Sequence, residues 1–182
     1  MTTNNWRESA TSTSQFAAPL AAGTYLIGDP CYAFDNDDPN GDLWNKWLDA
    51  CWEGLDADRT QIMYGRVSTY LIAASGTEHG DGTYYDQDGF EYSVDAGLLG
   101  AVPVSALHST YPKLARKNYD DLQEATGMRV VSMAVPFHVS YESGVVVIGP
   151  YRIDTNWYQE EDTCSWCGEP HDEGDCLDDP ED

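Results

Sequence analysis

With 182 residues, 41% of them hydrophobic, the chain is long enough to bury the core of one domain. Its 32 acidic and 9 basic residues give a net charge of −23, which excludes proteins that bind nucleic acid or anionic membranes through a basic surface. The sequence shows neither a secretory signal nor an apolar run that would span a bilayer. We therefore expect a cytoplasmic protein without membrane or nucleic-acid partners, whose acidity reflects either adaptation to high salt or imitation of nucleic acid.

The chain divides into three parts by composition. Residues 1–18 are rich in Ser, Thr and Asn and are expected to form a flexible leader. Residues 19–158 are expected to form an α+β globular domain, built on a mostly antiparallel twisted sheet or small barrel with two helices. Residues 159–182 are expected to form an acidic tail that carries Cys and His. From residue 154 onward the chain has 12 acidic residues and neither Lys nor Arg.

The first predicted strand begins at Thr24 and ends at a bend. Gly28-Asp29-Pro30 forces this bend, because Pro lacks an N–H and keeps the residue before it out of the helical region. An acidic, turn-rich loop follows at residues 35–42. It matches a calcium-binding loop in part, but Trp47 stands at the twelfth position, where such a loop needs a bidentate Glu. We therefore interpret it as a solvated loop.

The next predicted element is a helix from about Asp42 to Gly54, where apolar residues recur at the i, i+3, i+4 spacing of one buried face. A second predicted helix ends at Gly127, a residue type that commonly stops helices. The remaining predicted elements are one strand or a strand pair at 61–75, a strand at 98–104, the second helix at 110–126, and two long strands at 128–141 and 145–153 that meet at a turn.

An Asp88-Gly89 pair between alternating runs predicts a β-hairpin with a two-residue type I′ turn. With that turn, the face of the hairpin that packs on a core would carry Thr83, Tyr85, Gln87, Phe90, Tyr92 and Val94. The opposite face would carry Asp86, Glu91, Ser93 and Asp95. Asp86 and Glu91 would then lie directly opposite each other, and such like charges repel unless a cation, a basic side chain or solvent relieves them.

The strongest chemical motif lies in the tail, where Cys and His stand at metal-ligand spacing: Cys164-x2-Cys167-x3-His171-x4-Cys176. Two thiolates two residues apart form a hook, and a second pair nearby closes a tetrahedral site for a structural Zn²⁺. The motif resembles a zinc knuckle, although a knuckle has four residues between its second Cys and the His. The segment has no basic residue, so we expect zinc binding without nucleic-acid binding.

Cys31 follows the Gly-Asp-Pro bend and is a candidate nucleophile, with Asp29 to orient a base. The candidates for that base are His79, His108 and His138. The candidate reactive or ligand residues of the domain are Asp29, Cys31, Asp86, Glu91 and Asp95. Nothing in the sequence brings them together, so we assign no catalytic residue.

Two segments carry a resemblance to a known family. GTYLIGDPCYAF at residues 23–34 and GDGTYYDQDGFEYSVDAGLLGAVP at residues 80–103 resemble an uncharacterised family of small bacterial and phage proteins, which share a GDPCY-type strand end and a downstream GDG…VDAG…VP segment. The likeness extends over roughly residues 23–153. It implies a bacterial or phage accessory protein, and it implies no catalytic residue.

We therefore expect a non-enzymatic interaction or regulatory protein whose acidic surface engages a basic partner surface, with a structural zinc site in the tail. Two alternatives stay open. One is a small hydrolase or transferase that uses Cys31 or the carboxylates of Asp29 and Asp95. The other is a structural protein of a virion.

Overall fold

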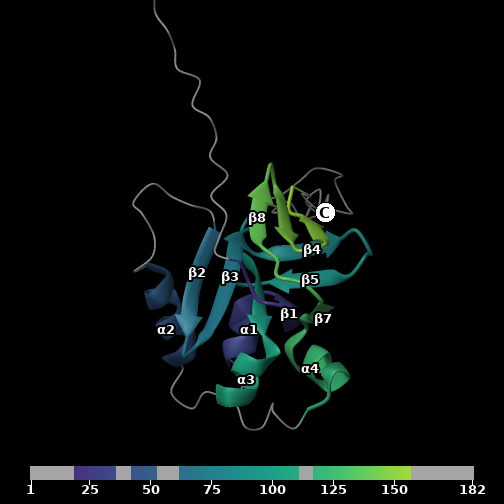
Figure 1. Ribbon diagram of the computed structural model, residues 1–182. Helices are drawn as coiled ribbons and strands as arrows, with labels where there is room; N and C mark the ends of the chain where they lie inside the picture. The colour runs from purple at the N-terminus through teal and green to yellow at the C-terminus, as the bar shows by residue number, and fades with distance from the viewer. Residues whose placement is uncertain (1–18, 36–41, 53–61, 111–116, 157–182) are drawn as a thin grey trace, which may run out of the picture.

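The computed structural model describes residues 19–35, 42–52, 62–110 and 117–156. Within these residues the fold has three layers: four helices, a first five-stranded sheet, and a second five-stranded sheet (Figure 1). All strand pairs in both sheets are antiparallel. The predicted α+β class and the antiparallel pairing are therefore confirmed. The prediction of a single sheet or barrel with two helices was too simple.

The first sheet is the middle layer of the molecule. Its strand order is β2-β3-β6-β1-β7. The strands are β1 (Gly23–Gly28), β2 (Ile62–Val67), β3 (Tyr70–Gly76), β6 (Leu98–Pro103) and β7 (Arg129–Met133). The central strand β6 is buried at all six positions, because helices cover one of its faces and the second sheet covers the other. The predicted strand at 98–104 is confirmed by β6, and of the two alternatives for 61–75 the strand pair is the correct one, formed by β2 and β3.

The second sheet has the strand order β5-β4-β10-β9-β8. Its strands are β4 (Gly82–Asp86), β5 (Glu91–Val94), β8 (Val139–Glu142), β9 (Val145–Ile148) and β10 (Tyr151–Asp154). Most of its strands alternate between buried and exposed or half-buried residues, as in the sequence of β5. This alternation is typical of a sheet with one face on the core and the other toward solvent.

Two apolar layers hold the molecule together. Between the sheets, Tyr25 and Ile27 of β1 belong to the same buried cluster as Ile148 of β9 and Ile153 of β10. On the other face of the first sheet, the helices contribute buried side chains such as Trp47 to a second cluster. Successive residues of a strand point to opposite faces, so Leu26 joins the helix side while its neighbours join the sheet side.

The four helices are α1 (Pro30–Asp35), α2 (Asp42–Trp52), α3 (Val104–Thr110) and α4 (Tyr119–Thr126). Figure 1 shows α3 and α4 at the lower end of the molecule and β8 and β4 in its upper part. The first predicted helix is confirmed by α2. The second is confirmed only in its last part, where Gly127 ends α4 with a φ of 65°. Helices α1 and α3 were not predicted from the sequence, and residues 111–116 lie outside the described part.

The two long strands predicted at 128–141 and 145–153 are four short ones. Pro136 and its neighbours separate β7 from β8, and Gly149-Pro150 separates β9 from β10. The predicted turn between β8 and β9 is confirmed: Ser143 and Gly144 both have positive φ, 52° and 81°, as a type I′ turn requires.

The predicted register of the β4–β5 hairpin was wrong by one residue. Asp86 pairs with Phe90 across a three-residue loop, and Gly89 has a φ of 79°. This geometry is typical of a type I turn followed by a bulge rather than of a two-residue turn. A shift of one residue exchanges the faces of a strand. Tyr84 and Asp86 of β4 are therefore buried, whereas Tyr85 and Gln87 face solvent.

Candidate functional site

The Asp29 carboxylate joins two segments that lie far apart in the chain, residues 28–31 and residues 95–96. Asp29 is fully buried between β1 and α1. One carboxylate oxygen accepts the backbone N–H of Cys31 at 2.9 Å and so caps the start of α1. The other accepts the N–H groups of Asp95 and Ala96 at 2.9 and 2.7 Å. Both oxygens accept backbone N–H groups, so Asp29 connects the GDP segment at residues 28–30 to the VDAG segment at residues 94–97. We call this connection the Asp29 joint.

Close packing around this joint explains why small residues stand in both segments. A Cβ on Gly28 would lie 2.9 Å from Met128 Cγ, and the φ of Gly28 is 151°. A Cβ on Gly100 would lie 2.7 Å from the carbonyl oxygen of Ala73 and 3.0 Å from the ring of Pro30. Larger residues would therefore push the backbones apart. Gly28 thus allows the close approach of Met128, and Gly100 allows that of β3 and of the first residue of α1.

The Cys31 thiol lies in the same joint, half-buried, and remains protonated. Burial raises its pKa, and the carboxylates of Asp29 and Asp95 raise it further. Tyr32 is affected in the same way: burial and a hydrogen bond with Asp95 raise its pKa. A nucleophilic Cys needs a lowered pKa and positive surroundings. The structure brings Asp29, Cys31 and Asp95 together, but their geometry does not activate the thiol.

Asp86 belongs to a different cluster, at the tip of the β4–β5 hairpin. Its side chain is fully buried and forms an ion pair with Arg129 of β7 in the other sheet. Arg129 also binds Asp88 at 2.9 Å, and its guanidinium carbon lies 5.4 and 4.6 Å from the ring centres of Phe90 and Tyr151. The cluster therefore joins the hairpin to the first sheet.

Hydrogen bonds keep the Asp86 carboxylate ionised. Burial alone would raise its pKa. The hydroxyl of Tyr92 donates to one oxygen at 2.8 Å, and the backbone N–H groups of Asp88 and Phe90 donate to the other at 2.9 and 3.0 Å. Together with Arg129 these donors lower the pKa below its ordinary value. The expected facing pair of Asp86 and Glu91 does not form, since Glu91 lies opposite Tyr85.

Glu91 lies instead on the outer face of the second sheet. The register of five strands places one residue from each in a single cross-strand row: Glu142, Val145, Asp154, Tyr85 and Glu91. Neighbouring strands lie about 4.8 Å apart, so the three carboxylates of this row are separated by roughly 10 Å. We call this row the acidic row.

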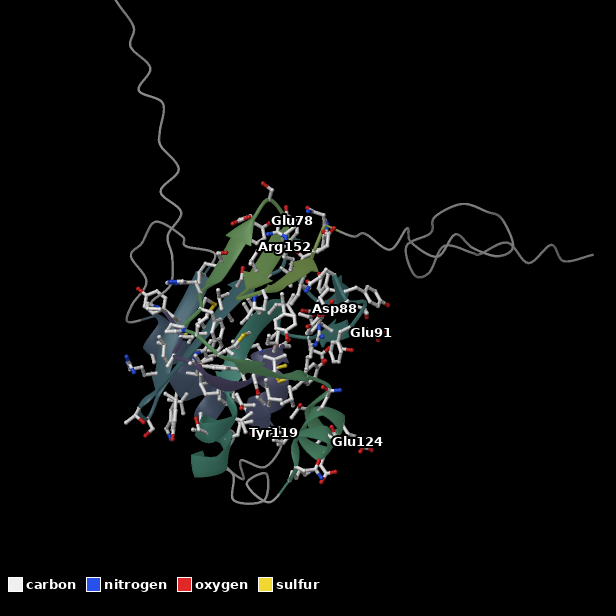
Figure 2. The ribbon with its side chains drawn as sticks, turned by 45° about the vertical axis from the view of Figure 1, so that its right-hand side comes forward. Glu78, Asp88, Glu91, Tyr119, Glu124 and Arg152 are labelled. Atoms are coloured by element: carbon white, nitrogen blue, oxygen red, sulfur yellow. The ribbon has the colours of Figure 1, made fainter. Side chains whose placement is uncertain are left out.

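The acidic row faces away from the helices. The helices pack on the far face of the first sheet, and no described helix belongs to the cluster that contains the second sheet. Figure 2 shows Glu91 and Asp88 at one side of the second sheet, and Glu124 on α4 at the lower end of the molecule. Nη1 of Arg152 lies 3.8 Å from Oε2 of Glu142, and this ion pair offsets part of the negative charge of the acidic row.

The predicted zinc ligands Cys164, Cys167, His171 and Cys176 lie outside the described residues. The partial calcium-loop match at residues 36–41 lies outside them as well. Within the described ranges, no group of three or more His, Cys, Asp or Glu side chains is arranged to hold a metal ion. The zinc site therefore stays a prediction from the sequence.

Two residues that matter to the arrangement, Arg129 and Thr155, were not predicted from the sequence. Arg129 stands at the start of a strand and binds two carboxylates of a hairpin about 40 residues earlier in the chain. Thr155, fully buried, donates to the carbonyl oxygen of Gly144 at 2.6 Å and accepts the N–H of Glu78 at 3.1 Å. The one signal in the sequence that could have drawn attention to Arg129 is the scarcity of basic residues in an acidic chain.

Comparison of the chain with protein-family models, with curated proteins and with solved structures finds no match. Among the helices that the structure describes, none has the length and apolar character needed to cross a membrane.

Proposed function

We propose that this protein is a non-enzymatic interaction or regulatory protein, an accessory protein of a bacterium or phage, that binds a basic surface of a partner protein. The observation that carries the proposal is the acidic row. Its carboxylates, Glu91, Asp154 and Glu142, are exposed on a sheet face that no described helix covers. Lys and Arg side chains of a partner would complement such a face.

The balance of charge on the described surface supports the same proposal. The exposed carboxylates belong to Asp49, Glu78, Asp81, Asp88, Glu91, Asp95, Asp120, Asp121, Glu124, Glu142 and Asp154. Two of the few arginines, Arg129 and Arg152, are already paired with carboxylates of the chain itself. The surface therefore presents a field that attracts cationic partners and accelerates their association.

The chemistry of the Asp29 joint favours binding over catalysis. Asp29 uses both oxygens to hold backbone N–H groups, which is a structural role. The raised pKa of Cys31 removes the thiolate that a hydrolase or transferase would need. In the proposal, the predicted zinc site at Cys164, Cys167, His171 and Cys176 holds the acidic tail in a fixed shape.

The test compares two triple variants with the same change in net charge. The first neutralises the acidic row with Glu91→Gln, Glu142→Gln and Asp154→Asn. The second neutralises exposed helix residues with Asp49→Asn, Asp120→Asn and Glu124→Gln. Binding of an octalysine peptide is measured by titration calorimetry at low salt with the full-length protein. We expect the first triple to weaken binding about three- to tenfold, because exposed ion pairs each contribute little.

The helix triple should weaken binding to a clearly smaller extent. Equal weakening by both triples would show that only net charge matters, and it would contradict a docking role for the acidic row. Because the ion pairs are exposed, the difference between the two triples should shrink as salt is added.

A further inference from the structure

The first sheet contains a gap where its central strand ends. β6 lies between β1 and β3, and its last residue, Pro103, pairs with Tyr25 of β1. The next residue begins α3, so the chain leaves the sheet. β1 and β3 continue beyond this point, to Gly23 and Tyr70. Two strands that flank a missing one lie roughly 10 Å apart, which is room for one extended chain.

A cavity of about 310 Å³ occupies this gap. Its walls come from residues 19–25, from the β2–β3 hairpin, and from Pro103 and Ser105. The volume lies at the small end of the range for ligand sites, about 300–1,000 Å³. We call this cavity the strand gap.

The strand gap has a charge opposite to that of the rest of the protein. Among the residues that the structure describes, no Asp or Glu lines it, although the chain has a net charge of −23. Arg66 is a charged residue of its wall, and three residues that carry hydroxyl groups, Thr24, Thr69 and Ser105, also line it. These groups suit an anionic or hydrogen-bonding ligand and not a cation.

The Arg66 guanidinium is held in place by its own hairpin. Nη1 of Arg66 donates to the carbonyl oxygen of Thr69 at 3.0 Å. A guanidinium has five N–H donors in a fixed fork, and a carboxylate accepts two of them side by side. Anchoring by Thr69 reduces the side-chain entropy that such a pairing would cost.

We propose that the strand gap binds the end of an extended peptide, with its free C-terminal carboxylate paired to Arg66. The peptide continues the line of β6. Backbone polar groups of a strand alternate between its two sides, so Gly23–Tyr25 and Tyr70–Leu71 present part of theirs to the gap. Main-chain hydrogen bonds to both strands then provide affinity, and the arginine selects a chain end. The proposal is independent of the acidic row, which faces solvent on the other sheet.

The experiment uses the full-length, ¹⁵N-labelled protein and three probes: acetyl-Ala-Val-Ala with a free carboxylate, the same peptide as its C-terminal amide, and propionate. Binding is followed through the amide signals of Gly23, Thr24 and Tyr70. We expect the peptide acid to bind and shift these signals. The amide should bind about tenfold more weakly, because a hydrogen bond to a charged group contributes more than one to a neutral group.

Variants separate the local ion pair from general electrostatics. Arg66→Gln should weaken binding of the peptide acid about tenfold or more, whereas Arg152→Gln, an exposed arginine on the other sheet, should leave it unchanged. Ser105→Phe should block the gap without a change in charge. Spectra of the variants without peptide show whether each keeps its fold.

Three results would overturn the proposal. One is equal binding by the Arg66 and Arg152 variants, and another is equal binding of the acid and the amide. The third is the absence of shifts in the strand-gap signals at about 1 mM peptide. Propionate that binds as tightly as the peptide would assign the gap to small organic acids and would contradict a peptide ligand.

Discussion

At the scale of single residues, Asp29 and Asp86 are buried carboxylates whose charge is balanced by donors of the chain itself. Asp29 accepts three backbone N–H groups. Asp86 accepts two such groups, a tyrosine hydroxyl and a guanidinium. A buried carboxylate costs free energy unless its oxygens are paired. Both residues therefore stabilise the fold, although their sequence contexts suggested reactive or ligand sites.

The environment of Cys31 predicts that its thiol reacts slowly with alkylating reagents. Burial and the neighbouring carboxylates raise its pKa, so at pH about 8 iodoacetamide should modify it at least about tenfold more slowly than glutathione. Peptide mass spectrometry distinguishes it from the four other cysteines of the chain. Asp95→Asn should speed the reaction, because it removes one charge that raises the pKa, whereas Asp81→Asn should not. Modification as fast as that of glutathione would favour the nucleophile interpretation.

The Asp86 cluster predicts a loss of stability in acid. The folded state lowers the pKa of Asp86 below its ordinary value of 3.8, so its contribution is complete above that value and is lost as the pH falls through the lower, folded-state pKa. The free energy of unfolding in urea should therefore fall more steeply below pH 3.8 in the unmodified protein than in Asp86→Asn. At neutral pH that variant should be less stable by about 3–5 kcal/mol, because it removes the buried partner of Arg129, which keeps only the exposed carboxylate of Asp88.

Asp49→Asn, a change at an exposed carboxylate, is the control for the Asp86 variant. It should leave both the stability and its steepness in acid unchanged. An Asp86→Asn protein with the same acid dependence as the unmodified protein would show that other carboxylates determine the transition.

At the scale of elements, α2 packs on β2 with almost no space between their backbones. A Cβ on Gly65 would lie 2.9 Å from the carbonyl oxygen of Trp47 and 2.9 Å from the Cys51 sulfur. Cys51 is buried there, and burial raises the pKa of its thiol to about 12. The predicted apolar face of the helix is thus the face that meets the sheet.

Gly65→Ala should destabilise the protein by about 1–3 kcal/mol, because the added methyl group forces α2 away from β2. Urea unfolding measures this loss. Gly23→Ala is the matched control, since its Cβ would lie 3.6 Å from Tyr25 in ordinary contact. An equal effect of both substitutions would attribute the loss to glycine chemistry in general and not to the contact between α2 and β2.

The β4–β5 hairpin shows why an element can be recognised while its register is not. The Asp-Gly pair marks a turn, but the same pair fits a two-residue turn and a three-residue loop with a bulge. Asp86 selects the longer loop, because its side chain bonds the N–H groups of Asp88 and Phe90. Arg129 then holds that carboxylate from another sheet. The hairpin alone does not contain this information.

At the scale of the whole molecule, the acidic side chains are distributed unevenly between two surfaces, the acidic row and the strand gap. The acidic row occupies the open face of the second sheet, whereas the described residues that line the strand gap of the first sheet include no Asp or Glu. Such separation keeps an anionic ligand of the gap away from the carboxylates of the row. Net charge alone would have predicted repulsion of anions everywhere on the protein.

The tail motif predicts one zinc ion per chain. Native mass spectrometry of the full-length protein should show a single Zn²⁺ that a chelator removes. Cys164→Ser should lose the metal, and Cys31→Ser should keep it. A purified protein without stoichiometric metal would contradict the site and leave the tail as an acidic extension.

The sequence by itself determined the features that depend on neighbours along the chain. These include the α+β class, helix α2 from its apolar spacing, the end of α4 at Gly127 and the turn at Ser143-Gly144. Each follows from backbone preferences or periodicity over a few residues. Such features can be predicted from the sequence of a short segment alone.

Tertiary structure alone decided how distant segments meet. Asp29 binds backbone groups 66 and 67 residues away, and Arg129 binds Asp86 across 43 residues. The division into two sheets, the register of β4 and the strand gap follow from such contacts. Local sequence does not encode them, because each contact gains its free energy only when packing has already brought both partners out of water.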